Sequence, residues 1–401
     1  MDGFVKPIGI LMGNPMKFSK KLDSVKGVMT VEMNALLTRL KQEGREVINL
    51  GVGDPDFSPP ESLRRVLRDG VNRPDSHHYP SFYPLQPLKE AIADWYQRRF
   101  RVGLDSRGEV LPLLGSTDGL FNIHLCLLDP GDIALVPDPC YPSYESAARL
   151  AGGVVERFPL LRENDFLPAL EEIPSETAKK AKMIWMNYPN NPTGATAPPE
   201  FHQKLIAWAK AYDVAVVSDA AYSEVYFENQ PPVSFLEFPG AREVGVELHS
   251  LSKSFNCCGW RIGMMVGNRD LIDALSRVKA HSDRGIFYPL QQAAIEALKS
   301  PPDFMKTRNR IFQERRDLVV RGLEEIGLEV YRPKATFYIW AKVPPGYTSR
   351  DFCFKALEEA NVWMLPGANY GKCGEGYLRI AVTRSAEVLS EAMQRLKKLS
   401  T

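Results

Sequence analysis

The sequence carries no sign of a membrane-spanning or nucleic-acid-binding protein. Its 50 lysines and arginines balance 49 aspartates and glutamates, which gives a formal net charge of +1. This balance excludes the strongly basic surface by which proteins bind nucleic acids or anionic membranes. No apolar run approaches the roughly 20 residues that a transmembrane helix needs. The N-terminal apolar patch at residues 8–12 is too short for the core of a secretory signal.

Cysteine is also scarce. The six cysteines lack metal-ligand spacing, and a chain of 401 residues is not expected to depend on a disulfide framework. Cys257 and Cys258 are adjacent and are not expected to pair with each other. We therefore predict reduced thiols in a cytoplasmic protein. The sequence has no internal repeat and no low-complexity linker, and its hydrophobic content of 44% is ordinary for a soluble globular protein.

What the sequence does contain is a regular alternation of apolar runs and amphipathic segments. This alternation predicts an α/β fold with a mostly parallel sheet and helices on both of its faces. The predicted buried strands are 110–115, 133–138, 183–186, 214–219, 244–251 and 262–266, and the predicted helices are 88–100, 120–127, 199–212, 270–280 and 290–299.

The pattern changes after Pro301 and Pro302, where a long charged helix is predicted from Asp303 to about residue 326. Short predicted strands and a final amphipathic helix follow. The length of 401 residues likewise favours one large domain and one smaller domain. The aromatic residues of one C-terminal strand, which we expect to form a partly apolar wall, are Phe337, Tyr338 and Trp340.

Lys253 stands between two predicted buried strands, in the string Ser250-Leu-Ser-Lys-Ser-Phe-Asn-Cys-Cys-Gly-Trp-Arg261. A lysine ammonium is unreactive until desolvation or a neighbouring cation lowers its pKa. In this position Lys253 is well placed to form a Schiff base. Ser250, Ser252 and Arg261 are suited to hold a phosphate nearby. The competing interpretation of this window is a solvated turn lysine.

Two further polar residues end buried strands. Asn191 follows the apolar run 183–186 in the string Tyr188-Pro-Asn-Asn-Pro-Thr-Gly194, and Asp219 ends the run 214–219, with Tyr222 three residues later. In open α/β sheets, ligands bind outside the carboxyl ends of the strands. Taken singly, Asp219 also fits a helix N-cap and Asn191 a turn residue. Together with Lys253 they indicate one site.

Two other patterns are suited to bind anions. Residues 115–119 read Gly-Ser-Thr-Asp-Gly and open the predicted helix 120–127, so Ser116 and Thr117 are candidate phosphate donors, although a simple capped helix start has the same geometry. Arg379, in the string Gly376-Tyr-Leu-Arg-Ile-Ala381, is the candidate clamp for a substrate carboxylate, because its planar fork matches a carboxylate bidentately. A structural ion pair is the alternative for Arg379.

In order and spacing, five motifs resemble those of the class I/II aminotransferases, which are pyridoxal 5′-phosphate (PLP) enzymes of fold type I. The motifs are Gly51-Val-Gly-Asp-Pro-Asp-Phe57, Asn191-Pro-Thr-Gly194, Ser218-Asp-Ala-Ala-Tyr222, Ser250-Leu-Ser-Lys253 and Gly376-Tyr-Leu-Arg-Ile-Ala381. The resemblance covers roughly residues 25 to 398. It implies a large PLP-binding domain at 47–300 and a small domain that joins residues 1–46 to 301–401.

The resemblance implies a role for each candidate residue. Asp219 pairs with the cofactor's ring nitrogen, and Asn191 and Tyr222 bind its phenolic oxygen. Tyr141 stacks on the ring. The residues that the resemblance assigns to the phosphate are Ser116, Thr117, Ser250, Ser252, Arg261 and, from the partner subunit of a homodimer, Tyr79. The residues that it assigns to the substrate are Gly53, Asn191 and Arg379.

The implied activity is transfer of an α-amino group to a 2-oxo acid by a ping-pong mechanism, with Lys253 as the Schiff-base lysine and general base. The nearest pattern is that of bacterial LL-diaminopimelate aminotransferases. Many of those proteins read Asp-Ser-Gly-x-Phe where this chain reads Asp283-Arg-Gly-Ile-Phe287. Arg284 is suited to pair with a distal carboxylate, or it is a solvated loop residue.

Several functions therefore stay open from the sequence. The candidate substrates are LL-diaminopimelate, glutamate with 2-oxoglutarate, aspartate and alanine. A PLP-dependent C–S β-lyase uses the same cofactor residues and is the main alternative. A PLP-sensing module without catalysis is disfavoured, because such modules carry a DNA-binding appendage for which 401 residues leave no room.

Overall fold

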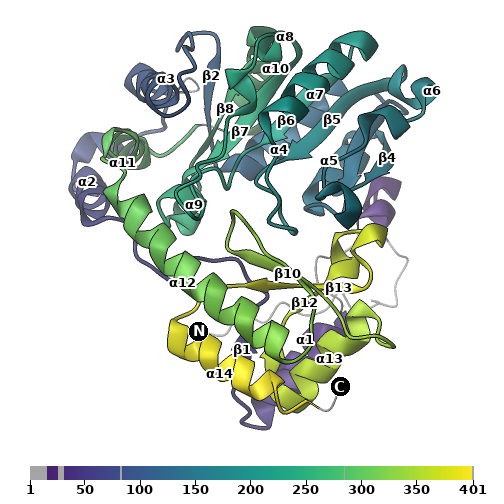
Figure 1. Cartoon of the computed structure of the whole chain (residues 1–401). Helices are drawn as coiled ribbons and strands as arrows, with labels where there is room; N and C mark the ends of the chain where they lie inside the picture. The colour runs from purple at the N-terminus through teal and green to yellow at the C-terminus, as the bar shows by residue number, and fades with distance from the viewer. Residues whose placement is uncertain (1–15, 26–30, 82–83, 284, 400–401) are drawn as a thin grey trace.

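The computed structural model describes residues 16–25, 31–81, 84–283 and 285–399. The larger part of the molecule is built on a seven-stranded sheet in the order β2-β8-β7-β6-β5-β3-β4 (Figure 1). Its strands are β2 (Val110–Leu113), β3 (Ile133–Asp138), β4 (Val154–Pro159), β5 (Ala181–Asn187), β6 (Ala215–Asp219), β7 (Gly245–Ser250) and β8 (Gly263–Gly267).

The sheet is mostly parallel, as the sequence predicted. The neighbours from β7 to β4 pair in parallel, whereas β8 is antiparallel to both β7 and β2. The β7–β8 connection, residues 251–262, therefore needs no crossover to the opposite end of the sheet. The parallel strands inside the sheet are covered on both faces and are mostly continuous apolar runs, whereas the edge strand β4 is largely exposed.

Helices cover both faces of this sheet, which gives it two cores. Alternate residues of each strand face opposite cores: Leu135 belongs to one core, and Ala134 and Val136 belong to the other. One face carries α4 (Ser116–Leu127), α5 (Ser143–Ala151) and α10 (Arg269–Ser282). The other carries α3 (Gln86–Phe100), α7 (Pro199–Tyr212) and α11 (Tyr288–Lys299), with α2 (Glu61–Val71) against α11. The short helices α6 (Ser175–Ala178), α8 (Ala241–Val244) and α9 (Leu251–Ser254) lie in connections.

The C-terminal part has its own antiparallel sheet, in the order β12-β13-β10-β9. Its strands are β9 (Val330–Tyr331), β10 (Tyr338–Lys342), β12 (Leu365–Pro366) and β13 (Tyr377–Ala381). Beside it, β1 (Ile48–Asn49) pairs in parallel with β11 (Val362–Trp363). The helices of this part are α1 (Val31–Gln42), α12 (Asp303–Glu325), α13 (Ser349–Ala360) and α14 (Ala386–Leu396).

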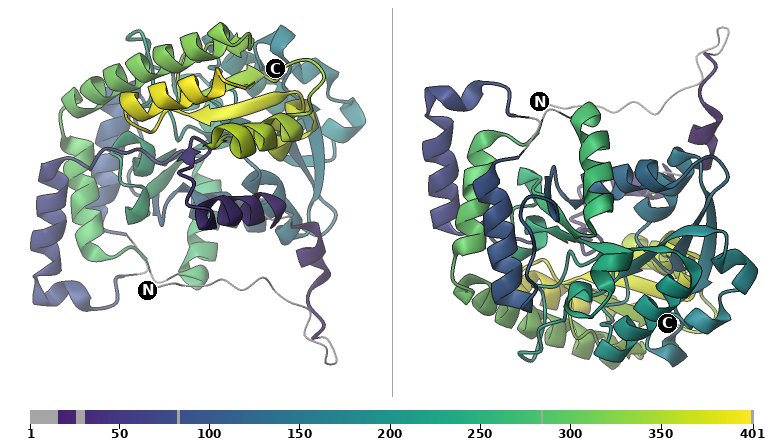
Figure 2. Two further views of the ribbon diagram at one scale, coloured as in Figure 1. Left: turned by 90° about the horizontal axis from the view of Figure 1, so that it is seen from below. Right: turned by 90° about the horizontal axis from the view of Figure 1, so that it is seen from above.

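Helix α12 connects the two parts, and it begins just after the Pro301–Pro302 break, as predicted. Met305, near its start, packs in a core of the large sheet, whereas Phe312 and Val319 pack in the core of the C-terminal part. Figure 1 shows the helix running from α11 down to α14. In the left view of Figure 2, seen from below, α12 and α14 lie side by side.

Candidate active site

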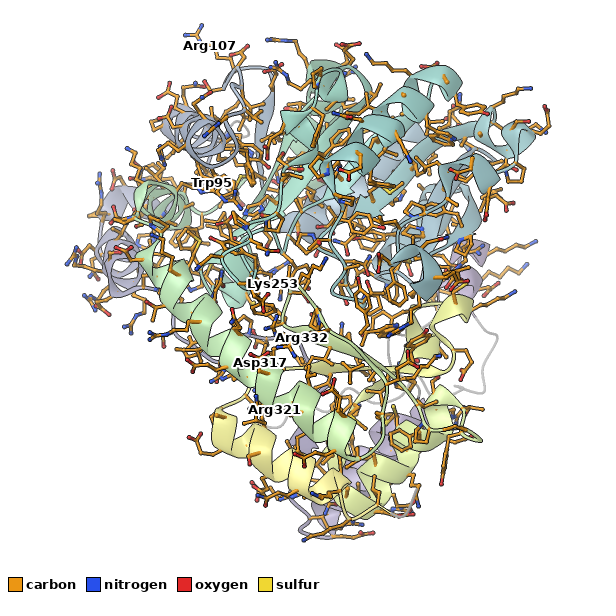
Figure 3. All side chains as sticks on the ribbon, viewed as in Figure 1. Trp95, Arg107, Lys253, Asp317, Arg321 and Arg332 are labelled. Atoms are coloured by element: carbon orange, nitrogen blue, oxygen red, sulfur yellow. The ribbon has the colours of Figure 1, made fainter. Side chains whose placement is uncertain are left out.

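A cavity of about 410 Å³ lies where the carboxyl ends of β5, β6 and β7 meet the C-terminal part. Its wall contains Asn187, Asp219 and Ser250, which are the last residues of those three strands. Tyr338 and Arg379, from β10 and β13, line it from the other side. Figure 3 shows Lys253 at the junction between the two parts of the molecule. The rule that placed the predicted site at strand ends therefore holds.

Lys253 lies in α9, a short helix that directly follows β7. The Ser250 hydroxyl caps this helix by accepting a hydrogen bond from the Ser252 N–H at 3.2 Å, which is why a helical turn forms where the sequence predicted a plain turn. The Nζ atom of Lys253 donates to the carbonyl oxygen of Gly53 at 2.9 Å and lies 3.5 Å from the Cys258 sulfur. The lysine side chain therefore points into the cavity, which it lines.

Asp219 is a buried carboxylate that is satisfied by neutral donors. The Tyr144 hydroxyl donates to it at 2.7 Å, and the Ala221 N–H donates at 3.0 Å. Burial raises the pKa of the Asp219 carboxyl, and these two hydrogen bonds only partly oppose that rise. Among the described residues no cation forms an ion pair with Asp219, so a cationic partner from a ligand would favour its charged form.

Asn191 and Tyr222 are held in place by the side chains around them. The backbone N–H of Asn191 donates to Asn187 Oδ1 at 2.8 Å, while Asn187 Nδ2 donates to the carbonyl oxygen of Asp219 at 2.8 Å. The hydroxyls of Tyr222 and Tyr338 lie 3.1 Å apart. Asn187 thus links the ends of two neighbouring strands and fixes both Asn191 and Asp219.

A cluster of donors gathers at the start of α4. Gly115 precedes this helix with a φ of +75°, and no side chain caps the helix. The positive φ favours glycine here, and a Cβ atom on Gly115 would come within 2.5 Å of an Arg261 nitrogen and displace that side chain. Arg261 also lies 3.5 Å from the Thr117 hydroxyl. Ser116, Thr117, Ser250, Ser252 and Arg261 all line this end of the cavity.

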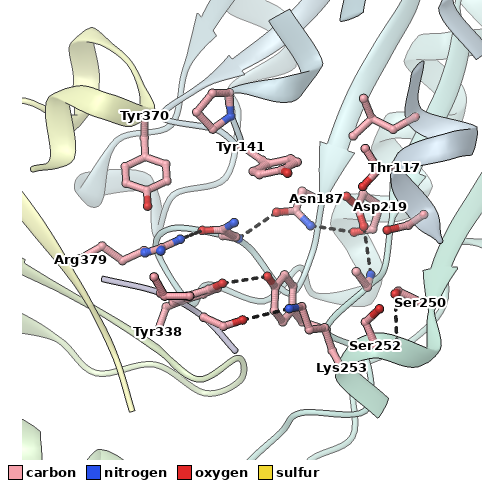
Figure 4. Close-up of a pocket in the computed structure, with 18 of the residues that line it drawn as sticks. Thr117, Tyr141, Asn187, Asp219, Ser250, Ser252, Lys253, Tyr338, Tyr370 and Arg379 are labelled. Atoms are coloured by element: carbon pink, nitrogen blue, oxygen red, sulfur yellow. Dashed lines mark hydrogen bonds between the residues drawn. The ribbon is translucent and has the colours of Figure 1, made fainter. Parts of the chain in front are cut away.

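Arg379 occupies the opposite end of the cavity, as Figure 4 shows for Arg379 and Thr117 on either side of Lys253. Its two terminal nitrogens donate to Asn191 Oδ1 at 2.8 Å and to the Gly51 carbonyl at 2.6 Å. Its carbon centre lies 4.0 Å from the Tyr338 ring centroid. Burial by itself lowers the pKa of this guanidinium. The surrounding tyrosine hydroxyls, led by Tyr370, raise the pKa by more than burial lowers it, so the pKa lies above its usual value and Arg379 keeps its charge.

The structure brings together most of the residues singled out from the sequence. Gly53 and Tyr141 also line the cavity. Tyr79 does not line it within one chain, and its side chain is 84% exposed. Arg284 lies outside the described residues. Of the predicted aromatic wall, Tyr338 lines the cavity, whereas Trp340 stacks on Tyr377 with ring centroids 5.2 Å apart.

Sequence reasoning missed several residues of this site. Tyr144, the donor to Asp219, lies one helical turn after Tyr141 at the start of α5, where its spacing was the available signal. Asn187 ends β5 and follows the same strand-end rule as Asp219. Tyr370, which lines the cavity from a 3₁₀ turn, had no local signal.

Comparison with known proteins gives the family. The family model for aminotransferase class I and II matches residues 45–396. The chain belongs to the class I and II aminotransferases. It is 48% identical, over 92% of its length and 95% of the relative's, to a protein named LL-diaminopimelate aminotransferase from Syntrophobacter fumaroxidans. It is 45% identical to another of that name from Aquifex aeolicus, over 96% of this chain and 99% of the relative.

Solved structures of aminotransferases share the fold. The substrate-bound BacF structure from Bacillus subtilis aligns with a TM-score of 0.91 at 38% identity, covering 96% of this chain and 98% of that one. A mutant aspartate aminotransferase of Thermus thermophilus aligns with a TM-score of 0.90 at 29% identity, covering 96% and 100%. This aminotransferase is therefore a PLP-dependent transferase of fold type I.

The residues of this aminotransferase fit PLP at both ends of the cofactor. The buried Ser252 hydroxyl has no hydrogen-bond partner among the described residues, and the uncapped start of α4 presents N–H groups beside Arg261, so this end suits a phosphate. The buried Asp219 carboxylate suits a protonated ring nitrogen. At the end of the cavity away from α4, the buried Nε of Arg379 also has no hydrogen-bond partner among the described residues.

The described residues contain no helix that is both long and apolar enough to span a membrane. All six cysteines are free thiols in the structure.

Proposed function

We propose that this aminotransferase uses Lys253 to exchange the amino group between an α-amino acid and a 2-oxo acid in two half-reactions. The observation that carries the proposal is the position of Lys253 Nζ inside a cavity that has a phosphate-suited end at α4 and a carboxylate-suited end at Arg379. When bound, PLP accepts the amino group and withdraws electrons from the substrate's α-carbon.

The proposed residue roles follow from the contacts. Asp219 pairs with the ring nitrogen and keeps it protonated, which its burial without a cationic partner among the described residues supports. Asn191 and Tyr222 donate hydrogen bonds to the phenolic oxygen, and Tyr141 packs on the ring. The residues proposed for the phosphate are Ser116, Thr117, Ser250, Ser252, Arg261 and Tyr79 of the partner subunit.

For the substrate, we assign the α-carboxylate to Arg379, with Asn191 and Gly53 beside it. The guanidinium is already oriented by Asn191 and the Gly51 carbonyl, so little side-chain entropy is lost when a carboxylate binds. Lys253 Nζ then removes the proton from the substrate's α-carbon. Its contact with the Gly53 carbonyl gives the free amine a fixed position.

The proposal extends to substrate, assembly and location. LL-diaminopimelate comes first among the candidates because eight relatives at 44–48% identity carry that name. Glutamate with 2-oxoglutarate, aspartate and alanine follow.

The active unit is a homodimer, which the exposed Tyr79 side chain supports. In each subunit the large domain comprises residues 47–300, and the small domain combines residues 1–46 with 301–401. The free thiols support a cytoplasmic location.

The decisive experiment is a half-reaction screen. The PLP-loaded enzyme is mixed with single amino acids, and loss of the absorbance of the bound cofactor is followed over time. LL-diaminopimelate and glutamate are expected to react, and each is then paired with 2-oxo acids to identify the acceptor. If no amino acid lowers the absorbance of the bound cofactor, the proposed transfer is wrong. Release of ammonia and pyruvate from a cysteine conjugate without any 2-oxo acid would instead identify a C–S β-lyase.

A further inference from the structure

Arg308, on helix α12, is buried beneath the segment that carries Lys253. Its side chain is only 2% exposed, yet no carboxylate among the described residues pairs with it. Instead, one terminal nitrogen donates to the main-chain carbonyls of Lys253 and Ser254, both at 2.6 Å. The other donates to the carbonyl of Glu224 at 2.5 Å, two residues after Tyr222.

A buried cation of this kind is expensive unless its donors are fully used. An apolar side chain of similar size would fill the same space at no desolvation cost, so packing does not explain Arg308. Two of its acceptors, the carbonyls of Lys253 and Ser254, end α9, where so short a helix offers them no partner of its own. Arg308 thus fixes the main chain of Lys253 itself.

A second arginine on α12 holds the other side of the Lys253 contact. Arg315, two turns further along, donates both terminal nitrogens to Asp56, at 2.8 and 2.9 Å. Asp56 lies three residues after Gly53, whose carbonyl accepts from Lys253 Nζ. This pairing is bidentate, and Arg315 is only 5% exposed, so it is a strong and directional contact.

The two arginines are fixed relative to each other by aromatic rings on the same face. Phe312 lies between them, with its ring centroid 5.9 Å from the carbon centre of Arg308 and 5.8 Å from that of Arg315. Phe57, beside Asp56, packs edge-on against Phe312 at 5.7 Å. The arginines, the two rings and the Asp56 segment therefore form one packed cluster against α12.

We propose that helix α12 positions the Lys253 amine: Arg308 fixes the main chain that carries the lysine, and Arg315 fixes the segment that carries its acceptor, Gly53. Both arginines are positioning residues, because neither lines the cavity. Since α12 spans the cores of both parts of the molecule, it ties the distance between Lys253 and Gly53 to the placement of the C-terminal part. The inference rests on the proposed role of Lys253 as the reactive amine.

The test compares Arg308→Met and Arg308→Lys with Arg310→Met in the PLP-loaded full chain. Arg310 lies on the same helix, but its side chain is 74% exposed, so it is the matched control. Displacement of a catalytic group by about 1 Å costs on the order of 100-fold in rate. We therefore expect Arg308→Met to slow the single-turnover half-reaction by about 10- to 100-fold. The KM of the amino donor is expected to change little, because Arg379 is intact. Arg308→Lys should recover part of the rate, because its ammonium still donates to the carbonyls. The recovery should be incomplete, because an ammonium reaches fewer of them than a guanidinium does.

A second measurement needs no substrate. Amide hydrogen exchange at residues 251–256 of the full chain should become faster in Arg308→Met and stay at the parent value in Arg310→Met. A parent half-reaction rate together with parent exchange in Arg308→Met would overturn the inference. If the parent enzyme reacted with no amino acid at all, the proposed function would fail. The exchange result would still show whether Arg308 fixes the main chain around Lys253.

Asp56→Asn tests the other end of the same contact, and it keeps the inference testable if Arg308→Met does not fold. The Asp56 side chain is 24% exposed and its replacement is nearly isosteric, so folding is expected to survive. Loss of the charge-assisted pair should loosen the Gly53 segment and lower the half-reaction rate roughly 10-fold, with unchanged cofactor affinity. A parent rate in Asp56→Asn would contradict the role of Arg315.

Discussion

Arg379 donates to Asn191 at 2.8 Å although the two residues are 188 positions apart in the chain. Asn191 lies beyond the end of β5 in the large sheet, whereas Arg379 is in the middle of β13 in the C-terminal part. This hydrogen bond joins the two parts of the molecule across the cavity. It leaves the guanidinium oriented and its buried Nε without a partner among the described residues, which is the state expected of a carboxylate receptor.

Arg379→Ala is expected to weaken binding of α-amino acids by roughly 2–5 kcal/mol, because a charge-assisted bidentate contact is lost. The KM of the amino donor should rise steeply, while the absorbance of the bound cofactor stays unchanged. Steady-state kinetics with several amino donors measures this effect. If the variant binds α-amino acids as tightly as the parent does, the carboxylate clamp lies elsewhere.

Lys253→Ala is expected to abolish turnover, because it removes the amine that we propose as the base for the α-proton. PLP should still bind without a covalent bond, since the donors at the start of α4 and Arg261 are untouched. Borohydride reduction followed by mass measurement checks this prediction. A PLP group that stays attached to the protein in this variant would mean that another lysine is the reactive one.

Asp219→Ala is expected to slow proton removal from the substrate by orders of magnitude, because it removes the anion that we propose as the partner of the protonated ring nitrogen. Single-turnover absorbance measurements give the rate. Tyr144→Phe is an informative companion, because it removes only the 2.7 Å hydrogen bond to this carboxylate and should have a smaller effect. Equal rates in Asp219→Ala and the parent would reject the assignment.

Arg284→Ala tests the substrate side chain. An arginine is suited to pair with the distal carboxylate of glutamate or diaminopimelate, whereas alanine has no such group. We expect a selective loss of kcat/KM with glutamate when glutamate and alanine are assayed in parallel. Unchanged rates with both amino acids would reject this role for Arg284.

Glu247 gives a prediction for pH dependence. This carboxylate is buried in β7, where it accepts hydrogen bonds from Tyr96, Ser234 and the Phe235 N–H. Burial raises its pKa from 4.5 to about 7, and these hydrogen bonds only partly oppose the rise. Because the folded-state pKa is the higher one, the contribution of Glu247 to stability is full below about pH 4.5 and is lost as the pH rises through about 7.

The shift corresponds to roughly 3 kcal/mol of folding free energy between those limits. Glu247→Gln removes the ionisation, and hydroxyls can rotate to accept from its amide. The variant should therefore gain stability relative to the parent at pH 8 more than at pH 5. Thermal unfolding at both values, with PLP bound, checks this. A stability difference between variant and parent that does not change with pH would contradict it.

Much of the fold was readable from the sequence because its signals are local. The helix Pro199–Tyr212 and the strand Ile133–Asp138 were predicted at the observed bounds, since prolines, glycines and continuous apolar runs mark their ends. Asp219 and Asn191 were recognised for the same reason: each follows a buried strand, and strand ends form the ligand-binding edge of such sheets. The short helix around Lys253 was missed because its cap, Ser250, acts over two residues inside a strand-like run.

The sequence by itself thus determined the layered architecture and the PLP-dependent family, and it predicted the groups that carry the chemistry. Only the tertiary structure decided which of those groups meet. Lys253 contacts Gly53 across 200 residues, and Tyr222 meets Tyr338 across 116. Arg308, which looks in the sequence like one more charge on a solvated helix, is buried under the lysine. Such pairings depend on how α12 and β13 dock against the large sheet, and that docking is set by the summed packing of two cores, which no local pattern records.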